Sequence, residues 1–280
     1  MTTQTPTPIH KAVQEHYGNL ARETGPCCES TGGTQDSQNV LYPRELLSSL
    51  PPDIANFTAG SGDPISLAEL QSGETVLDLG SGAGLDCFLA AKQVGESGHV
   101  IGVDMTPEML ERARSNAARL KAQNVEFREG FLEHLPVEGS SVNVIISNCV
   151  INLTPEKPPV FREMFRVLKP GGRIAVSDMV ANRVLSDEQR RDKEKWCGCT
   201  SGALGIRDYI EELGKAGFTE IRFEPNIDMI LKAIDSGQVR TEQDLSKEEL
   251  KKKILADLRN WENIKTTMIV PYKITAVKPA

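Results

Sequence analysis

The chain has 280 residues, of which 39% are hydrophobic and 25% are charged. These proportions are typical of a globular protein with a buried core and argue against a disordered or fibrous chain. The formal net charge is −7, and no dense basic run with interleaved aromatic residues occurs, so nucleic acid is not an expected partner. The amino terminus has no apolar signal core, and no stretch approaches the roughly 20 apolar residues of a membrane span. We therefore expect a cytoplasmic protein.

The first sixty residues are predicted to be loosely organised. Residues 1–8 are rich in Thr, Gln and Pro, and the polar stretch 29–38 predicts an exposed loop. Between them, residues 9–22 predict a helix with His10 and His16 on its surface. This part is expected to be an extension ahead of the main fold.

From residue 72, short apolar runs alternate with helical segments. The predicted strands are residues 75–80, 99–104, 125–129, 142–147 and 173–177. The predicted helices between them are residues 85–94, 107–123 and 159–168. Because strands and helices that alternate form parallel βαβ units, we predict an α/β fold with a doubly wound, mostly parallel Rossmann-like sheet.

Beyond Asp178 the pattern is less regular and predicts a C-terminal α+β region. Helices are expected over residues 187–196, 206–216 and within the charged stretch 229–264, and strands over 219–223 and 266–277. Pro271 is expected to interrupt the last strand because proline has no N–H for the ladder. We divide the chain into an extension (1–60), a core (61–182) and a C-terminal region (183–280).

A glycine-rich turn follows the first predicted strand. The run Asp78-Leu-Gly80-Ser-Gly82-Ala-Gly84 leads to a helix amino terminus, where glycines let the backbone approach a ligand closely. Asp104 ends the next strand, about where an acidic residue would meet a ribose diol. The glycine spacing does not fit the dinucleotide pattern G-x-G-x-x-G, and there is no Walker-type Gly-Lys-Ser or Gly-Lys-Thr.

The run VLDLGSGAG, followed by VD at the end of the second strand, resembles the signature of class I S-adenosylmethionine methyltransferases. The resemblance implies S-adenosyl-L-methionine as cofactor, with residues 80–82 beneath its methionine part and Asp104 on the ribose hydroxyls. Met105 would pack on the adenine, and Phe131 and Leu132 would flank its other face. The complete implied set of cofactor-binding residues is Asp78, Gly80, Ser81, Gly82, Asp104, Met105, Phe131, Leu132 and Ser147.

A sharper resemblance, over most of residues 10–217, is to the arsenite methyltransferases. Its motifs are Tyr17-Gly18 followed by Cys27-Cys28, Leu85-Asp86-Cys87 after the glycine turn, Ser147-Asn-Cys149-Val-Ile-Asn152, and Cys199-Thr-Ser-Gly202. The resemblance implies that Cys149 and Cys199 bind As(III) and that Cys87 forms a redox pair with Cys27 or Cys28, of which Cys28 is favoured. The implied catalytic residues are Cys28, Cys87, Cys149 and Cys199.

The chemistry of the cysteines is consistent with this resemblance. Thiolates are the ligands that select soft, thiophilic ions such as As(III). Cys149 follows the fourth strand at the carboxyl edge of the sheet, where open α/β sheets bind ligands. Because As(III) carries a lone pair, it needs no general base, and none of the four histidines falls in a recognisable acid/base arrangement. The expected reaction is therefore methyl transfer to arsenite, or its thiol adducts, in arsenic detoxification, with small thiols or thioredoxin as reductant.

Several alternatives stay open. A single Cys is most often a small buried hydrophobe, so packing and chemistry are equally good explanations for Cys87, and Cys197, which matches no family motif, is expected to be a bystander. Many relatives carry a further Cys within the segment that corresponds to residues 57–64, and this chain does not. The rival functions are methylation of a small organic acceptor, with the cysteines as packing residues, and a non-catalytic arsenite or metal sensor. Neither the number of methyl groups nor the use of antimony or selenium is predicted, and a monomer is the default expectation.

Overall fold

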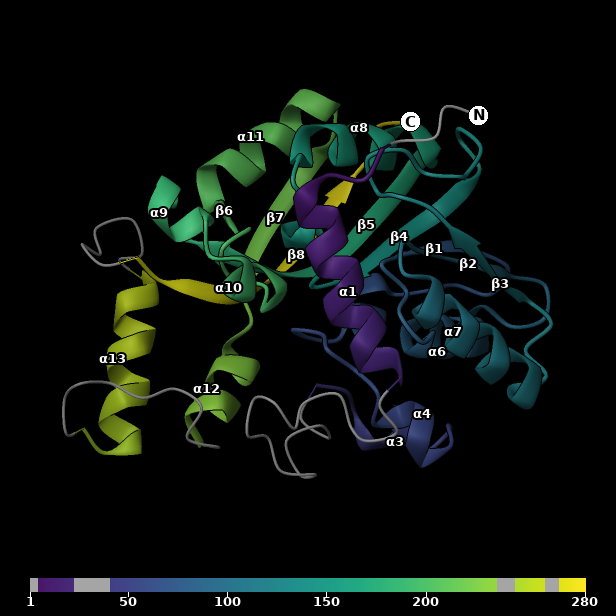
Figure 1. The fold of residues 1–280 in the computed structure, drawn as a ribbon, viewed down its shortest axis with the longest axis horizontal. Coiled ribbons are helices and arrows are strands. Elements are labelled where there is room, and N and C mark those ends of the chain that lie inside the picture. Colours follow the sequence, from purple (N-terminus) through teal and green to yellow (C-terminus); the bar gives the residue numbers. More distant parts are fainter. Residues whose placement is uncertain (1–4, 23–40, 236–244, 260–266) are drawn as a thin grey trace.

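A computed structural model describes residues 5–22, 41–235, 245–259 and 267–280, and the other residues are not described here. Its centre is one eight-stranded sheet with helices packed against it (Figure 1). The strands are β1 (Thr75–Leu79), β2 (His99–Asp104), β3 (Val125–Glu129), β4 (Val142–Asn148), β5 (Leu168–Ala181), β6 (Leu204–Gly205), β7 (Thr219–Pro225) and β8 (Ile269–Val277).

The strand order is β3-β2-β1-β4-β5-β8-β7, with β6 paired to β5. Strands β1 to β5 run parallel to one another, whereas β8 is antiparallel to both β5 and β7. The order reverses between β1 and β4, which makes their carboxyl ends the switch point at which doubly wound sheets bind ligands. The predicted doubly wound, mostly parallel sheet is thus confirmed, and β7 and β8 extend it.

The helices connect these strands or precede them. They are α1 (Pro8–Arg22), α3 (Arg44–Leu47), α4 (Pro52–Ala55), α5 (Pro64–Ala68), α6 (Leu85–Val94), α7 (Pro107–Leu120), the 3₁₀ turn η2 (Ile151–Leu153), α8 (Lys157–Val167), α9 (Asp187–Arg190), α10 (Lys193–Cys197), α11 (Ile206–Ala216), α12 (Ile227–Asp235) and α13 (Lys247–Arg259). No helix in the described part of the chain is long and apolar enough to cross a membrane.

The central strands are largely apolar, as expected when both faces of a sheet are covered. Successive side chains of a strand point to opposite faces. Along β4, Ile145 belongs to the core cluster that contains residues of α8 and α11, whereas Val144 and Ile146 belong to the cluster that contains residues of α6 and α7. Continuous apolar runs are expected in such strands. For this reason the central strands could be predicted from the sequence.

Two predictions for the C-terminal region were wrong in detail. Residues 187–196 form two helices instead of one, because Ser186 and Asp192 each cap a separate helix amino terminus. Pro271 does not interrupt β8. The pairing of β7 with β8 ends at Pro225 and Tyr272, so β8 is an edge strand at Pro271, where proline is tolerated. The predicted division at residues 60 and 182 stays a prediction.

Candidate active site

A cavity of about 130 Å³ lies where β1 and β4 end. Its walls include the glycine turn after β1, the end of β2, Gly130 and Leu132, and the residues that follow β4. Among the residues predicted from the sequence, those that line it are Gly80, Ser81, Gly82, Asp104, Met105, Leu132 and Cys149. The cavity therefore joins most of the predicted cofactor site to one predicted arsenic ligand.

The glycine turn packs closely on the segment that follows β4. Gly80 has a φ of +67°, and a Cβ placed there would lie 2.3 Å from Cγ2 of Val150. The backbone N–H groups of Gly80 and Ser81 both donate to the carbonyl of Val103, at 2.8 and 3.0 Å. Only glycine combines this left-handed backbone with so close a contact, which explains the residue type at position 80.

Asp104 joins the glycine turn to the start of α7. Its carboxylate accepts hydrogen bonds from the backbone N–H of Gly82 at 2.9 Å and of Thr106 at 2.8 Å. Burial raises the pKa of Asp104, and these N–H donors oppose that rise. The carboxylate is thereby held at the cavity wall, where it can accept hydrogen bonds from a pair of ligand hydroxyls.

The cavity suits a cationic nucleoside. Asp86 and Glu133 line it together with Asp104, and Met105 and Leu132 add apolar surface. Burial raises the pKa of Asp86 to about 7, while hydrogen bonds from Tyr42 and Asn148 favour its charged form.

A buried hydroxyl in the glycine turn also points to a polar ligand. Oγ of Ser81, which lines the cavity, has no hydrogen-bond partner within the described residues. An unsatisfied buried hydroxyl is costly unless a ligand or water completes it. The residues present thus fit S-adenosylmethionine, which offers both positive charge and polar groups.

Three predicted cofactor residues are not among the described residues that line the cavity: Asp78, Phe131 and Ser147. Asp78 is buried and accepts a hydrogen bond from the thiol of Cys87 at 3.2 Å. Phe131 packs against the ring of His10, with the ring centroids 4.8 Å apart. Their roles in cofactor binding stay predictions.

The two predicted arsenic ligands lie together. Cys149 follows β4 directly, and Cys199 follows α10. The thiol of Cys199 donates to the carbonyl of Cys149 at 3.3 Å. A hydrogen bond with the Cys149 thiol, together with burial, raises the pKa of Cys199 well above its usual value. Both residues have left-handed backbone, with φ values of +62° and +61°, a strained conformation for a non-glycine residue that often marks functional sites.

Neighbouring residues connect the two cysteines. The Nδ2 atom of Asn152 donates to Sγ of Cys149 at 3.5 Å and to the carbonyl of Cys199 at 3.3 Å. The hydroxyl of Tyr17 lies 3.9 Å from Sγ of Cys199. The loop that carries Cys199 approaches so closely that a Cβ at Gly202 would lie 1.9 Å from the carbonyl oxygen of Asn152. Both Asn152 and Gly202 occur in the motifs quoted above, but their contacts were not predicted.

The remaining cysteines have different surroundings. Cys87 is fully buried in α6, and burial together with the nearby Asp78 carboxyl raises the pKa of Cys87 well above its usual value. Cys87 is not among the described residues that line the cavity. Cys197 donates to the carbonyl of Ala12 at 3.7 Å. Cys27 and Cys28 lie outside the described residues, so the predicted redox pair stays a prediction.

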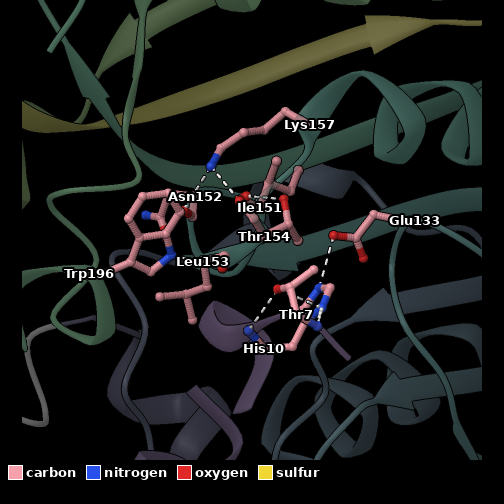
Figure 2. Close-up of polar contacts among 9 residues, drawn as sticks. All are labelled: Thr7, His10, Glu133, Ile151, Asn152, Leu153, Thr154, Lys157 and Trp196. Atoms are coloured by element: carbon pink, nitrogen blue, oxygen red, sulfur yellow. Dashed lines mark hydrogen bonds and ion pairs between the residues drawn. The ribbon is translucent and has the colours of Figure 1, made fainter. Parts of the chain in front are cut away.

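His10 was wrongly expected on the surface, whereas His16 is exposed as predicted. His10 is 1% exposed, and its Nε2 lies 3.0 Å from Oε1 of Glu133. Nδ1 of His10 faces Thr7, as Figure 2 shows. The amphipathic pattern of the helix gave no sign of this contact, because the partner lies 123 positions away in the chain.

Helix α1 covers the cavity. His10, Val13, Tyr17 and Leu20 all line it, and Nε2 of Gln14 donates to the carbonyl of Met105 at 2.7 Å. The helix also contacts α7 and α10, across the edge of the sheet where β1 and β4 end (Figure 1). The sequence predicted this helix but not its position over the site.

Comparisons with known proteins agree with this geometry. The model of a methyltransferase domain family matches residues 70–251. An arsenite methyltransferase of Halobacterium salinarum is 49% identical over 234 residues, which cover 79% of this chain and 60% of that protein. A demethylmenaquinone methyltransferase of Lactococcus lactis is 40% identical, but over only 37% of this chain. The chain spans about 60% of the length of the curated arsenite methyltransferases it matches.

A solved structure also matches this chain. The arsenic(III) S-adenosylmethionine methyltransferase of Chlamydomonas reinhardtii superposes with a TM-score of 0.62 and 34% identity, over 85% of this chain and 73% of that chain. The chain therefore belongs to the methyltransferase domain family and, within it, to the arsenite methyltransferases.

Proposed function

We propose that this protein transfers methyl groups from S-adenosylmethionine to As(III) bound by the thiolates of Cys149 and Cys199. The observation that carries the proposal is the pairing of these two cysteines, 50 positions apart, beside the cavity at the end of β4. Thiolates are suitable ligands for a soft ion. A methyltransferase for an organic acceptor would not need two adjacent thiols at this position.

The cavity residues would bind and orient the cofactor, which supplies an electrophilic methyl group on a sulfonium sulfur. Residues 80–82 would pass beneath its methionine part, and Asp104 would accept hydrogen bonds from the ribose hydroxyls. Met105 and Leu132 would pack on the adenine. Helix α1 would exclude water, since four of its residues line the cavity.

The thiol pair would hold arsenic with its lone pair toward the methyl group. The cofactor would supply the methyl group, and the thiolates of Cys149 and Cys199 would hold arsenic so that its lone pair could displace the sulfonium sulfur from that methyl carbon. Alignment and proximity supply most of the rate enhancement in such a reaction. No proton has to be removed from the acceptor, so no general base is required.

Methylated arsenic leaves this step formally pentavalent. Oxidation of Cys28 and Cys87 to a disulfide would supply two electrons and return arsenic to the trivalent state, and small thiols or thioredoxin would then reduce the disulfide. Because Cys87 is fully buried, this step requires its exposure. Reduced thiols persist in the cytoplasm, which is the compartment we propose, and we propose that the protein acts as a monomer.

The test is incubation of the protein with arsenite, S-adenosylmethionine and a thiol, followed by separation of the arsenic species over time. We expect methylated arsenic, and we expect Cys149→Ser and Cys199→Ser each to reduce its formation by about a hundredfold or more, since loss of a group that positions the reactants has effects of this size. Cys197→Ser, a neighbouring thiol that the proposal does not use, should retain activity.

Two results would contradict the proposal. Full activity in both Cys149→Ser and Cys199→Ser would show that arsenic is not bound by this pair. An absence of methylated arsenic, despite measured cofactor binding, would favour a small organic acceptor instead.

A further inference from the structure

The 3₁₀ turn η2 and the residue after it, Thr154, have three consecutive carbonyl groups bound by two buried side chains. Nζ of Lys157 donates to the carbonyls of Asn152 at 3.0 Å and Thr154 at 2.5 Å. Nε1 of Trp196 donates to the carbonyl between them, that of Leu153, at 2.9 Å. Figure 2 shows Lys157 and Trp196 reaching this turn together. The turn is therefore fixed by side chains from α8 and α10.

Lys157 is unusual because a buried amine is used for backbone contacts, and burial lowers the pKa of this amine to about 7. Only 4% of the residue is exposed, and its Nζ lies 5.0 Å from the centre of the Trp196 ring. Burying an ammonium group is costly unless hydrogen bonds and a nearby anion compensate for the lost water. Asp178, which is fully buried, provides the opposing charge. The Asp178 carboxyl accepts hydrogen bonds from the backbone N–H of Met179 at 2.9 Å and from the hydroxyl of Tyr209 at 3.4 Å.

One of these contacts is with Asn152, whose amide lies between the two cysteines. Nζ of Lys157 donates to its carbonyl at 3.0 Å. Its Nδ2 donates to Sγ of Cys149 and to the carbonyl of Cys199, whereas its Oδ1 has no partner within the described residues. Lys157 thus holds the backbone of Asn152 while the side chain of Asn152 contacts both residues of the thiol pair.

We propose that Lys157 is a positioning residue for the thiol pair. By holding the carbonyls of Asn152 and Thr154, it fixes the turn from which the Asn152 amide sets the position of the Cys149 sulfur. Asn152 touches that sulfur directly, and Lys157 acts through Asn152. The inference rests on the proposed function, since the pair is a ligand set only if arsenic binds there.

The experiment measures whether the two thiols can bind one arsenic atom together. The probe is phenylarsine oxide, whose arsenic forms bonds to two neighbouring thiols. Its binding is followed by quenching of Trp196, which packs in the same core cluster as Cys149 and Cys199. The chain has two tryptophans, so all variants carry Trp261→Phe, which leaves Trp196 as the single reporter.

Two variants remove the proposed contacts. Lys157→Met keeps an unbranched chain without a donor, and Asn152→Leu keeps a similar shape without the amide. Lys278→Met is the matched control, because Nζ of Lys278 also donates to two backbone carbonyls, of Phe165 and Leu168, and lies 4.6 Å from the Phe165 ring centre. Lys278 follows Val277, which pairs with Arg173 near the start of the parallel strands and not at the end of β4 where Cys149 lies.

We expect Lys157→Met and Asn152→Leu each to weaken binding of the probe about tenfold, the effect of losing about one hydrogen bond. Lys278→Met should change it less than twofold. The affinity for S-adenosylhomocysteine, measured by calorimetry, should stay within twofold of wild type in all three. A general loss of structure would weaken cofactor binding as well, so this second readout separates positioning from stability.

The outcomes distinguish this inference from the proposed function. If the wild-type protein does not bind the probe, or if Cys149→Ser binds it equally well, the proposed arsenic site itself fails. If the wild type binds through Cys149 but Lys157→Met binds with the same affinity, or Lys278→Met weakens binding as much, the role of Lys157 is refuted. Should Lys157→Met fail to fold, unchanged binding by Asn152→Leu would refute it equally.

Discussion

The glycine turn and the thiol pair meet at one cavity but are built differently. The turn is held by backbone hydrogen bonds to Val103 and by the Asp104 carboxylate, all within one βαβ unit. The thiol pair joins Cys149 to Cys199 and depends on the side chains of Asn152, Tyr17 and Lys157, which come from three separate elements. A local site can be recognised as a motif, whereas an assembled site depends on the packing of the whole region.

The largest expected effect is at Gly202, where the loop that carries Cys199 meets Asn152. In Gly202→Ala the new Cβ would lie 1.9 Å from a backbone carbonyl oxygen, so the loop must move away. We expect a loss of about 3 kcal/mol in the free energy of unfolding and loss of the binding of phenylarsine oxide. Urea denaturation and Trp196 quenching would measure the two effects.

Gly214→Ala is the control for that change, because a Cβ there meets nothing within 4 Å in α11. It should stabilise the protein by about 0.5–1 kcal/mol, as alanine does in a helix. Unchanged binding of phenylarsine oxide by Gly202→Ala would show that the loop that carries Cys199 does not need to lie close to Asn152.

The next effect concerns the glycine turn. Gly80→Ala adds a Cβ at 2.3 Å from Val150 and places alanine at a φ of +67°. We expect affinity for S-adenosylmethionine to fall about tenfold, in line with a cost of about 1–2 kcal/mol for left-handed backbone. Gly171→Ala shares the positive φ, at +76°, but meets nothing within 4 Å. Equal loss of cofactor affinity in both variants would contradict a specific role for the turn.

The smallest effect concerns the pH dependence of stability. Burial raises the pKa of Asp86 to about 7, whereas an unfolded Asp titrates near 4. Between these values the folded state binds more protons than the unfolded state, so the free energy of unfolding falls as pH rises from about 4 to 7. Asp86→Asn, which mimics the neutral carboxyl, should lose less stability over that range, by about 1 kcal/mol for each pH unit.

Urea denaturation at pH 5, 6 and 7 would measure this difference. Parallel stability curves for wild type and Asp86→Asn would contradict a raised pKa in the folded protein.

Much of the fold could be predicted from the sequence because the central strands bury both faces. Helix α6 has the predicted bounds, and β2 and β3 do as well. The division of residues 187–196 into two helices was missed, because the cap at Asp192 is a local side-chain contact that apolar periodicity does not reveal. The pairing of β8 between β5 and β7 was missed for a different reason, since strand order is a long-range property.

The candidate site likewise has some features that the sequence predicted and others that only the structure revealed. The sequence by itself located the glycine turn and the acidic residue at the end of β2, and it predicted Cys149 and Cys199 as the arsenic ligands, because each of these residues lies in a contiguous motif. Only the tertiary structure decided that Cys199 contacts Cys149, that His10 is buried against Glu133, and that Lys157 supports Asn152. The physical reason is that these contacts join segments far apart in the chain, and their energies come from burial and hydrogen bonds that exist only after the sheet has formed.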